Sequence, residues 1–198
     1  MKLVFFIKSS TVNLDNYTIK DVPGSSGRLD VISRCILATL LVKDGFERNI
    51  QIWVFLECFG SFIFKPKFFN YNTFPKNELR FTDYFVSFLK KSPNIGKKAL
   101  NPLSSIKVSK LNIVEAIRHF QKLNYHLYIL HENGKDFFRL FNSIQEKENI
   151  VFIIGSQEDE YIYSKELKAL NIPTISLGTQ SYLASSVIRL LKLHILSL

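Results

Sequence analysis

Apolar and polar residues follow two periods along the chain, and together these predict strands alternating with helices. Runs rich in β-branched and aromatic residues predict strands over 1–8, 50–57, 62–69, 126–130, 150–154 and 174–177. Apolar positions at three- and four-residue spacing predict helices over 28–43, 82–91, 112–123, 136–145, 158–169 and 181–198. Strands alternating with helices of about 10–15 residues predict an α/β fold with a mostly parallel sheet.

Breaker and capping residues mark where these elements end. Proline and glycine predict loops over 20–27 and 91–105, and Pro66 weakens the predicted strand 62–69. Asp44-Gly45 predicts the end of helix 28–43. Asn112 and Glu115 have the spacing of a capping box, which predicts that a helix begins at Asn112.

The 198 residues, of which 46% are hydrophobic, suffice for one domain, or one domain with a smaller appendage, with a buried core. We therefore predict a single domain over 1–198. The longest apolar runs are about five residues, whereas a membrane-spanning helix needs roughly 18. Lys8 interrupts the first apolar run too early for a signal peptide. We expect a cytoplasmic protein.

The metal-ligating residue types are few and scattered. Cys35 and Cys58 form no CxxC pair, and the four histidines show no HExxH-like spacing. We expect both cysteines to be small buried hydrophobic residues and predict no metal site.

The net charge of +9 is distributed unevenly. The segment 61–110 holds ten basic and two acidic residues together with ten of the 27 aromatic residues, whereas 151–198 is neutral. Lysine and arginine neutralise phosphates, and aromatic rings stack on unpaired bases. The segment 61–110 therefore predicts a nucleic-acid-contacting surface; the alternative is a solvated basic face over an aromatic core.

Glycine and polar residues follow three predicted strands at their carboxyl ends, where ligands bind in open α/β sheets. Leu130 is followed by His-Glu-Asn-Gly, Ile154 by Gly155, and Leu177 by Gly178. Glycine lets the backbone approach a ligand closely, although each one taken alone is an ordinary turn residue. The absence of a GxGxxG or Walker loop argues against a dinucleotide or nucleoside triphosphate.

Three charged residues crowd the first turns of the predicted helix 28–43. Asp30 is favourable near a helix N-terminus. Arg28 and Arg34 are unfavourable there unless they face a carboxylate or a phosphate. The alternative is a simple Arg–Asp surface pair.

The segment 20–35, Lys-Asp-Val-Pro-Gly-Ser-Ser-Gly-Arg-Leu-Asp-Val-Ile-Ser-Arg-Cys, resembles the N-terminal signature of the archaeal tRNA pseudouridine-54 N1-methyltransferases, the TrmY family. Its core is Pro-Gly-Ser-x-Gly-Arg-Leu-Asp. Similar segments follow in order at 128–134, 151–155 and 175–177, so the resemblance spans most of the chain. The segment 61–110 matches by position only.

This resemblance implies a SPOUT-class α/β fold, with a mostly parallel sheet flanked by helices and a trefoil knot over about 125–198. Such knots are rare exceptions to normal chain connectivity. It also implies a homodimer that binds S-adenosylmethionine in the knot and methylates N1 of a T-loop pseudouridine in tRNA. By matched position, the cofactor pocket involves Leu130, Gly155, Leu177, Gly178, Thr179, Gln180, Ser181, Tyr182 and Val187.

The sequence departs from the family pattern around this pocket. Relatives carry Asp-His and further glycines after the position of Gly155, where Ser156-Gln157-Glu158 stands here. A Ser-Pro-Leu-like loop is usual after the position of Leu177, and a cysteine is common where Val187 stands. Contacts through backbone atoms tolerate such changes, whereas contacts through side chains do not.

Methylation at N1 of pseudouridine requires the loss of the proton on that nitrogen, which a nearby carboxylate can polarise or accept. We predict that Asp30 does so and that Arg28 and Arg34 hold phosphates or base carbonyls; a purely structural cap is the alternative for Asp30. For the tRNA backbone we predict contacts from Lys90, Lys91, Lys97 and Lys98.

Other functions stay open. A related family methylates a pseudouridine of small-subunit rRNA by the same chemistry, but the Gly-Arg-Leu-Asp sequence favours the tRNA family. The altered pocket loops also allow a non-catalytic RNA-binding relative. A metal-dependent nuclease is disfavoured, because the carboxylates do not cluster in the sequence.

Overall fold

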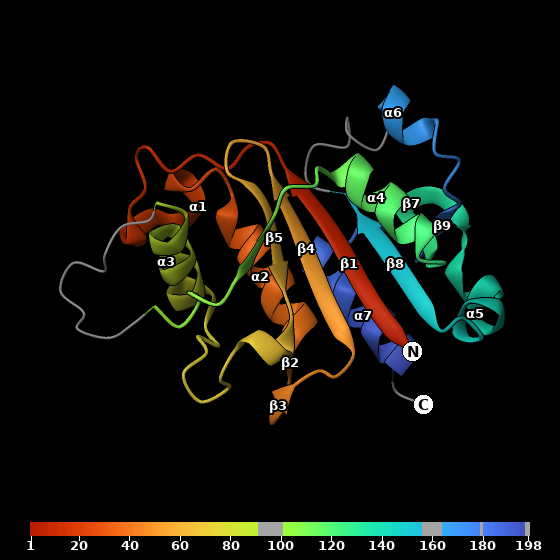
Figure 1. Ribbon diagram of the computed structural model, residues 1–198, viewed down its shortest axis with the longest axis horizontal. Coiled ribbons are helices and arrows are strands. Elements are labelled where there is room, and N and C mark those ends of the chain that lie inside the picture. The colour runs from red at the N-terminus through yellow and green to blue at the C-terminus, as the bar shows by residue number, and fades with distance from the viewer. Residues whose placement is uncertain (91–100, 156–163, 179, 197–198) are drawn as a thin grey trace.

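The computed structural model describes residues 1–90, 101–155, 164–178 and 180–196. Within these ranges the main sheet has seven strands in the order β6-β5-β4-β1-β8-β7-β9 (Figure 1). The strands are β1 (Lys2–Ser9), β4 (Ile50–Leu56), β5 (Gly60–Phe64), β6 (Lys107–Ser109), β7 (His126–Asp136), β8 (Asn149–Ile154) and β9 (Thr174–Ser176). The strands from β4 to β9 in this order are parallel, and β5 and β6 add an antiparallel edge.

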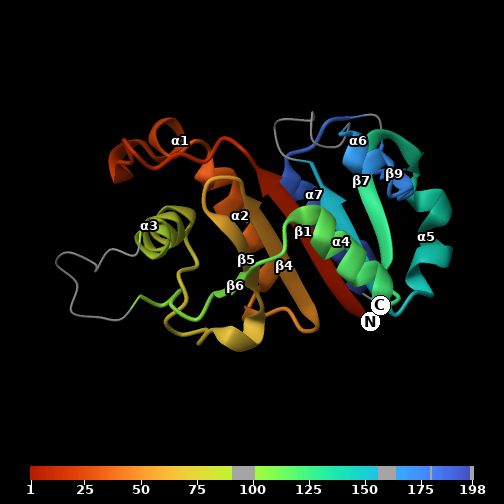
Figure 2. The same cartoon turned by 45° about the horizontal axis from the view of Figure 1, so that its top comes forward.

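Helices cover both faces of this sheet (Figure 2). They are α1 (Val22–Ser25), α2 (Leu29–Leu40), α3 (Glu78–Leu89), α4 (Ile113–Lys122), α5 (Phe137–Gln145), α6 (Lys165–Lys168) and α7 (Ala184–Leu196). Two 3₁₀ turns, η1 (Ile19–Asp21) and η2 (Pro66–Phe68), and a small hairpin of β2 (Leu41–Val42) and β3 (Gly45–Phe46) complete the described elements.

The central strand β1 is apolar almost throughout because both of its faces are covered. Leu3, Phe5 and Ile7 pack in the larger core, with α2, α3 and α7. Val4 and Phe6 point to the opposite face and pack in a second core, with α4 and α6. The alternation along β1 thus gives each face of the sheet its own layer of helices. The predicted mostly parallel sheet flanked by helices is confirmed.

The predicted helix at Asn112 is confirmed in detail. The Glu115 amide donates to Asn112 Oδ1 at 2.9 Å, and the Asn112 amide donates to Glu115 Oε2 at 2.8 Å. The strands predicted over 1–8, 50–57 and 150–154 also match β1, β4 and β8 within one residue at each end. Strong apolar periodicity and a complete cap are therefore sufficient to predict these elements from the sequence.

Other boundaries differ from the predictions for local reasons. The predicted loop 20–27 contains α1, because the Asp21 carboxylate accepts a hydrogen bond from the Gly24 amide. Helix 28–43 stops at Leu40, Lys43 and Asp44 form the turn of the β2–β3 hairpin, and Gly45 begins β3. The helix predicted from 82 begins at Glu78, where the Asn77 side chain caps it.

The structure corrects one further expectation and does not fully test two others. Cys35 is buried as expected, but Cys58 is exposed in the turn between β4 and β5, so the expectation for Cys58 was wrong. Much of the predicted helix 158–169 lies outside the described residues, and α6 is its described part. The trefoil knot predicted over about 125–198 stays a prediction.

Candidate active site

The turn before α2 holds two consecutive residues in the left-handed backbone region, Gly27 with φ 57° and Arg28 with φ 66°. A Cβ atom on Gly27 would overlap the carbonyl oxygen of Thr11, so glycine is required there. The Thr11 hydroxyl donates to the Gly27 carbonyl oxygen at 2.9 Å, and the Leu29 amide donates to Ser26 Oγ at 3.1 Å. These contacts fix the start of α2.

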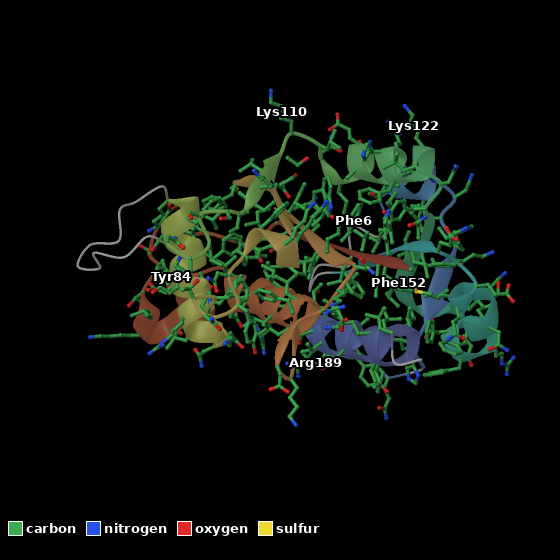
Figure 3. All side chains as sticks on the ribbon, turned by 60° about the horizontal axis from the view of Figure 1, so that its bottom comes forward. Phe6, Tyr84, Lys110, Lys122, Phe152 and Arg189 are labelled. Carbon is green, nitrogen blue, oxygen red and sulfur yellow. The ribbon has the colours of Figure 1, made fainter. Side chains whose placement is uncertain are left out.

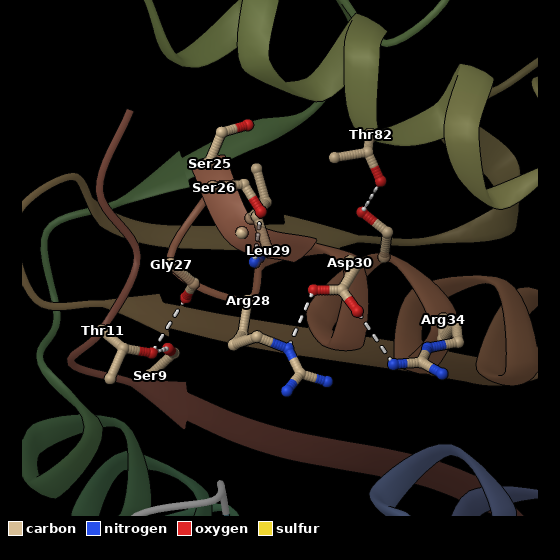
Figure 4. A network of polar contacts seen from close by, with 12 residues as sticks. Ser9, Thr11, Ser25, Ser26, Gly27, Arg28, Leu29, Asp30, Arg34 and Thr82 are labelled. Carbon is tan, nitrogen blue, oxygen red and sulfur yellow. Dashed lines mark hydrogen bonds and ion pairs between the residues drawn. The ribbon is translucent and has the colours of Figure 1, made fainter. Parts of the chain in front are cut away.

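Asp30, one residue into α2, is 97% buried although it carries a carboxylate. Arg28 Nε donates to Asp30 Oδ1 at 3.3 Å, and Arg34 Nη2 donates to Oδ2 at 2.9 Å. Figure 4 shows the two guanidinium groups approaching the carboxylate from opposite sides. The structure thus brings the three predicted residues together, and both arginines face this carboxylate. Each oxygen keeps a lone pair for a further donor, so the group can accept a proton or act as a rigid anchor.

The cluster continues from α2 into α3. Arg34 Nε lies 3.5 Å from Glu78 Oε2. Burial raises the pKa of Glu78, an effect that nearby Arg34 opposes and Asp30 reinforces. The Thr82 hydroxyl also donates to Ser33 Oγ at 2.8 Å. Two polar links therefore hold α3 against the helix that carries Asp30.

A cavity of about 510 Å³ opens where β7, β8 and β9 end, beside the start of α7. The strand-end residues Leu130, Ile154 and Ser176 form part of its wall. Its size falls within the ~300–1,000 Å³ of small-molecule sites. Val31 also lines the cavity, and it directly follows Asp30 in α2. The cavity and the Asp30 cluster are therefore neighbours.

Most residues predicted for the cofactor pocket line this one cavity. They are Leu130, Gly155, Leu177, Gly178, Gln180, Ser181, Tyr182 and Val187. The ninth, Thr179, lies outside the described residues. Their common location is an observation, whereas their binding of a cofactor stays a prediction.

The loop after β9 is shaped by its own backbone. Ser176 Oγ accepts a hydrogen bond from the Gly178 amide at 3.1 Å and donates to the Gly178 carbonyl oxygen at 2.8 Å. Gly178 has a φ of 127°, which residues with a side chain rarely adopt. The glycine that departs from the family pattern therefore has a local conformational reason.

Sequence reasoning from matched positions misses the wall residues 131–133. Leu130 and Lys135 of β7 both pair with Ile175 of β9, so the residues between them loop out of the strand. A Cβ atom on Gly134 would come within 2.6 Å of the Ile175 amide nitrogen, so this loop needs glycine there. The polar residues that follow a predicted strand end were the available signal. No local signal indicates Val31, because its place depends on how α2 packs.

Most of the lysines predicted to contact tRNA lie outside the described residues. Lys90 is exposed at the C-terminal end of α3, and Lys91, Lys97 and Lys98 lie outside the described residues. Across the described ranges, no group of three His, Cys, Asp or Glu side chains is arranged to hold a metal ion. No helix among these same residues is long and apolar enough to cross a membrane.

Comparison with known families decides what kind of protein this is. The model of a family described as "Putative SAM-dependent RNA methyltransferase" matches residues 1–198. The chain belongs to this family. The resemblance found in the sequence is thereby confirmed, together with the expected class of enzyme and its S-adenosylmethionine dependence.

Relatives within this family carry more specific names. The tRNA (pseudouridine(54)-N(1))-methyltransferase of Thermococcus onnurineus is 28% identical over 193 residues, which cover 93% of this chain and 92% of the relative. The protein of the same name from Pyrococcus abyssi is 28% identical over 212 residues, with 97% and 96% covered.

A solved structure shares the fold. The crystal structure of Archaeoglobus fulgidus Nep1 bound to S-adenosylhomocysteine matches with a TM-score of 0.63, covering 98% of this chain and 97% of that one. The sequence identity is 17%, so the likeness concerns the fold alone.

Proposed function

We propose that this protein transfers the methyl group of S-adenosylmethionine to N1 of pseudouridine 54 in the T-loop of tRNA. The names of relatives that match almost the whole chain support the reaction and its substrate. The observation that carries the proposal is the Asp30 cluster beside a cavity of cofactor size, with Asp30 and Val31 adjacent in the chain.

The residues of the cavity fit S-adenosylmethionine. Ile154 and Ile175 are apolar partners for a purine ring, and Glu132 is the only carboxylate among the described wall residues, able to accept hydrogen bonds from ribose hydroxyls. Peptide groups of the loop after β9 offer further donors and acceptors, which suits the altered side chains there. When bound, the cofactor supplies an activated methyl group.

The residues around α2 then perform the remaining tasks. Asp30 accepts the N1 proton of the target base, and Arg34 holds the carboxylate in one orientation. The Arg28 side chain is 42% exposed, which leaves its outer nitrogens free to reach a phosphate or a base carbonyl. Positioning of this kind can contribute up to ~7–11 kcal/mol to lowering the barrier.

The remaining parts of the proposal concern the assembly. We propose a cytoplasmic homodimer with a trefoil knot over about 125–198. Phe138 of α5 and Leu193 of α7 support a partner copy, because these large apolar side chains are 52% and 59% exposed. We also propose that Lys90, Lys91, Lys97 and Lys98 contact the tRNA backbone, in keeping with the surplus of positive charge over 61–110.

Two steps test this function against its rivals. The first is titration calorimetry with S-adenosylmethionine, and no binding would favour a non-catalytic RNA-binding protein. The second compares methyl transfer to pseudouridine-containing tRNA and to a small-subunit rRNA fragment. Transfer to the rRNA alone would replace the proposed substrate while leaving the chemistry intact.

A further inference from the structure

Among the residues that the structure describes, the edge of the main sheet farthest from β9 is formed by β6, which pairs only with β5. Val108 of β6 is 66% exposed, so this edge is open to solvent. The candidate cofactor cavity lies at the carboxyl ends of β7, β8 and β9, toward the other side of the sheet. Whatever binds at β6 therefore lies at a distance from the cofactor cavity.

Basic side chains without acidic partners are concentrated in the segment that carries this edge. The described residues of 58–111 include Lys65, Lys67, Lys76, Arg80, Lys90, Lys107 and Lys110, with only Glu78 and Asp83 as acidic residues. Glu78 pairs with Arg34, and Asp83 accepts a hydrogen bond from the Tyr17 hydroxyl. Within the part of the chain that the structure describes, none of the seven basic groups has a carboxylate at ion-pair distance.

Two of these lysines are held over aromatic rings. Lys76 Nζ lies 3.7 Å from the centroid of the Tyr71 ring, and Lys107 Nζ lies 5.9 Å from the centroid of Phe68. A ring attracts an ammonium group and restricts its motion without neutralising the charge. These lysines therefore lose less conformational entropy on binding an anion than a freely moving side chain does.

A chain of ring contacts joins the two lysine–aromatic pairs. Phe68 contacts Phe69, Phe69 contacts Phe74, Phe74 contacts Phe46, and Phe46 contacts Tyr71, with centroids between 5.0 and 6.4 Å apart. Both lysine–aromatic pairs thus rest on one packed cluster of aromatic rings, which fixes their positions relative to each other.

Lys65 and Lys67 lie beside the Phe68 pair in the chain, at the end of β5 and in η2. Burial and the neighbouring charge of Lys67 lower the pKa of Lys65. Like charges at close range repel each other, and a bound anion would remove that repulsion.

We propose that Lys65, Lys67, Lys76 and Lys107, the edge lysines, bind the phosphate backbone of RNA that extends from the reacting nucleotide toward β6. Such contacts position RNA without reading its sequence. The identification of this RNA as tRNA rests on the proposed function. Lys76 lines one hollow with Arg34, whereas Lys65, Lys67 and Lys107 lie toward β6. Full-length tRNA therefore engages all four edge lysines, and an isolated T-loop hairpin engages at most Lys76.

A charge-matched pair of variants tests this surface. The first replaces all four edge lysines with glutamine. The control replaces Arg118, Lys122, Lys147 and Lys165 with glutamine, four basic residues outside 58–111. Figure 3 shows Lys122 projecting from α4, well separated from Lys110 at the end of β6. Both variants lose four positive charges, so an effect of net charge alone is the same in both.

The measurement is the dissociation constant for full-length tRNA over a series of salt concentrations, by filter binding. The edge variant should bind roughly 10- to 100-fold more weakly at 0.1 M salt, with a log–log salt slope smaller in magnitude by roughly 2–3. The control should change the slope by less than about 1. For an isolated T-loop hairpin, the edge variant should lose less affinity than it loses for full-length tRNA.

Several outcomes overturn the proposal. Equal salt slopes for the edge variant and the control would overturn it. Failure of the wild-type protein to bind tRNA would also overturn it. The same holds for an edge variant that binds tRNA normally but loses an acidic protein partner. Failure of the proposed function looks different: tRNA binding that depends on the edge lysines, without methyl transfer to any pseudouridine. A Phe68→Leu variant, which keeps every charge, should weaken binding by less than the edge variant.

Discussion

Lys192 of α7 donates a hydrogen bond to the carbonyl oxygen of Thr39, 2.8 Å away at the end of α2. The same ammonium group donates to the carbonyl oxygens of Ala38 and Leu41, at 2.9 and 3.1 Å, and lies 3.7 Å from Glu47 Oε2. Carbonyl groups at a helix end lack partners within the helix, and a cation there is favourable. A buried lysine thus ties together α2 and α7, which both contribute residues to the wall of the candidate cofactor cavity.

Replacing Lys192 by methionine should therefore reduce stability strongly. The variant keeps the apolar stem but leaves buried carbonyl groups unpaired, so the free energy of unfolding should fall by about 2–4 kcal/mol. Urea unfolding measures this change. Lys122→Met on the exposed face of α4 is the control and should stay within about 0.5 kcal/mol of wild type. Equal effects of the two substitutions would contradict the role of Lys192.

Gly27→Ala should disrupt the turn before α2. The backbone φ of 57° is strained for alanine, and the added Cβ atom would overlap the Thr11 carbonyl oxygen. Together these effects should lower the free energy of unfolding by more than about 1–3 kcal/mol. Gly45→Ala is the matched control, because a Cβ atom there meets nothing within 4 Å. Thermal unfolding of both variants checks the difference, and a Gly27→Ala protein as stable as the control would refute this account of the turn.

Asp30→Asn should separate catalysis from cofactor binding. The amide keeps the shape of the side chain but accepts a proton poorly, so kcat should fall by roughly 10²- to 10⁴-fold. Affinity for S-adenosylmethionine should change little, since Val31, and not Asp30, is among the described residues that line the cavity. Asp44→Asn in the β2–β3 turn serves as the control. Full turnover of a folded Asp30→Asn variant would leave Asp30 with a structural role only.

The free energy of unfolding should depend on pH in the range where Tyr17 ionises. Burial, together with the charge of Asp83 and the hydrogen bond to it, raises the pKa of Tyr17 from 10.0 to about 12. The folded state then holds this proton more tightly than the unfolded state, so the contribution is complete below pH 10 and is lost as the pH rises from 10 to 12.

A Tyr17→Phe variant isolates this effect. Below pH 10 it should be less stable than wild type by about 0.5–1.5 kcal/mol, the usual value of a lost hydrogen bond. The difference should shrink between pH 10 and 12, as urea unfolding at several pH values would reveal. A difference that stays constant over this interval would show that Tyr17 ionises alike in both states.

Periodic and strongly apolar segments were predictable from the sequence, and segments defined by tertiary contacts were not. The capping box at Asn112 and the runs that became β1, β4 and β8 carry their signals locally. By contrast, β6 is three residues long, and it is a strand only because Ser61, Phe62 and Ile63 pair with it. Likewise, the capping of α2 by Lys192 joins residues more than 150 positions apart.

The candidate site divides in the same way. Arg28, Asp30 and Arg34 were recognisable because two arginines near a helix N-terminus need an anion, and Asp30 supplies it. The residues around Gly155 and Gly178 follow strands directly, so the strand-end rule indicates them. Val31 and the looped-out residues 131–133 depend on the packing of α2 and on the irregular β7–β9 pairing, which no single segment encodes.

The most direct measurement is methyl transfer from labelled S-adenosylmethionine to two tRNA transcripts that differ at position 54. One carries pseudouridine there and the other carries uridine, whose N1 is bonded to ribose and cannot be methylated. We expect label in the first transcript only, located at nucleotide 54 by digestion. Label in both transcripts, or in neither while the cofactor binds, would contradict N1-methylation of pseudouridine 54.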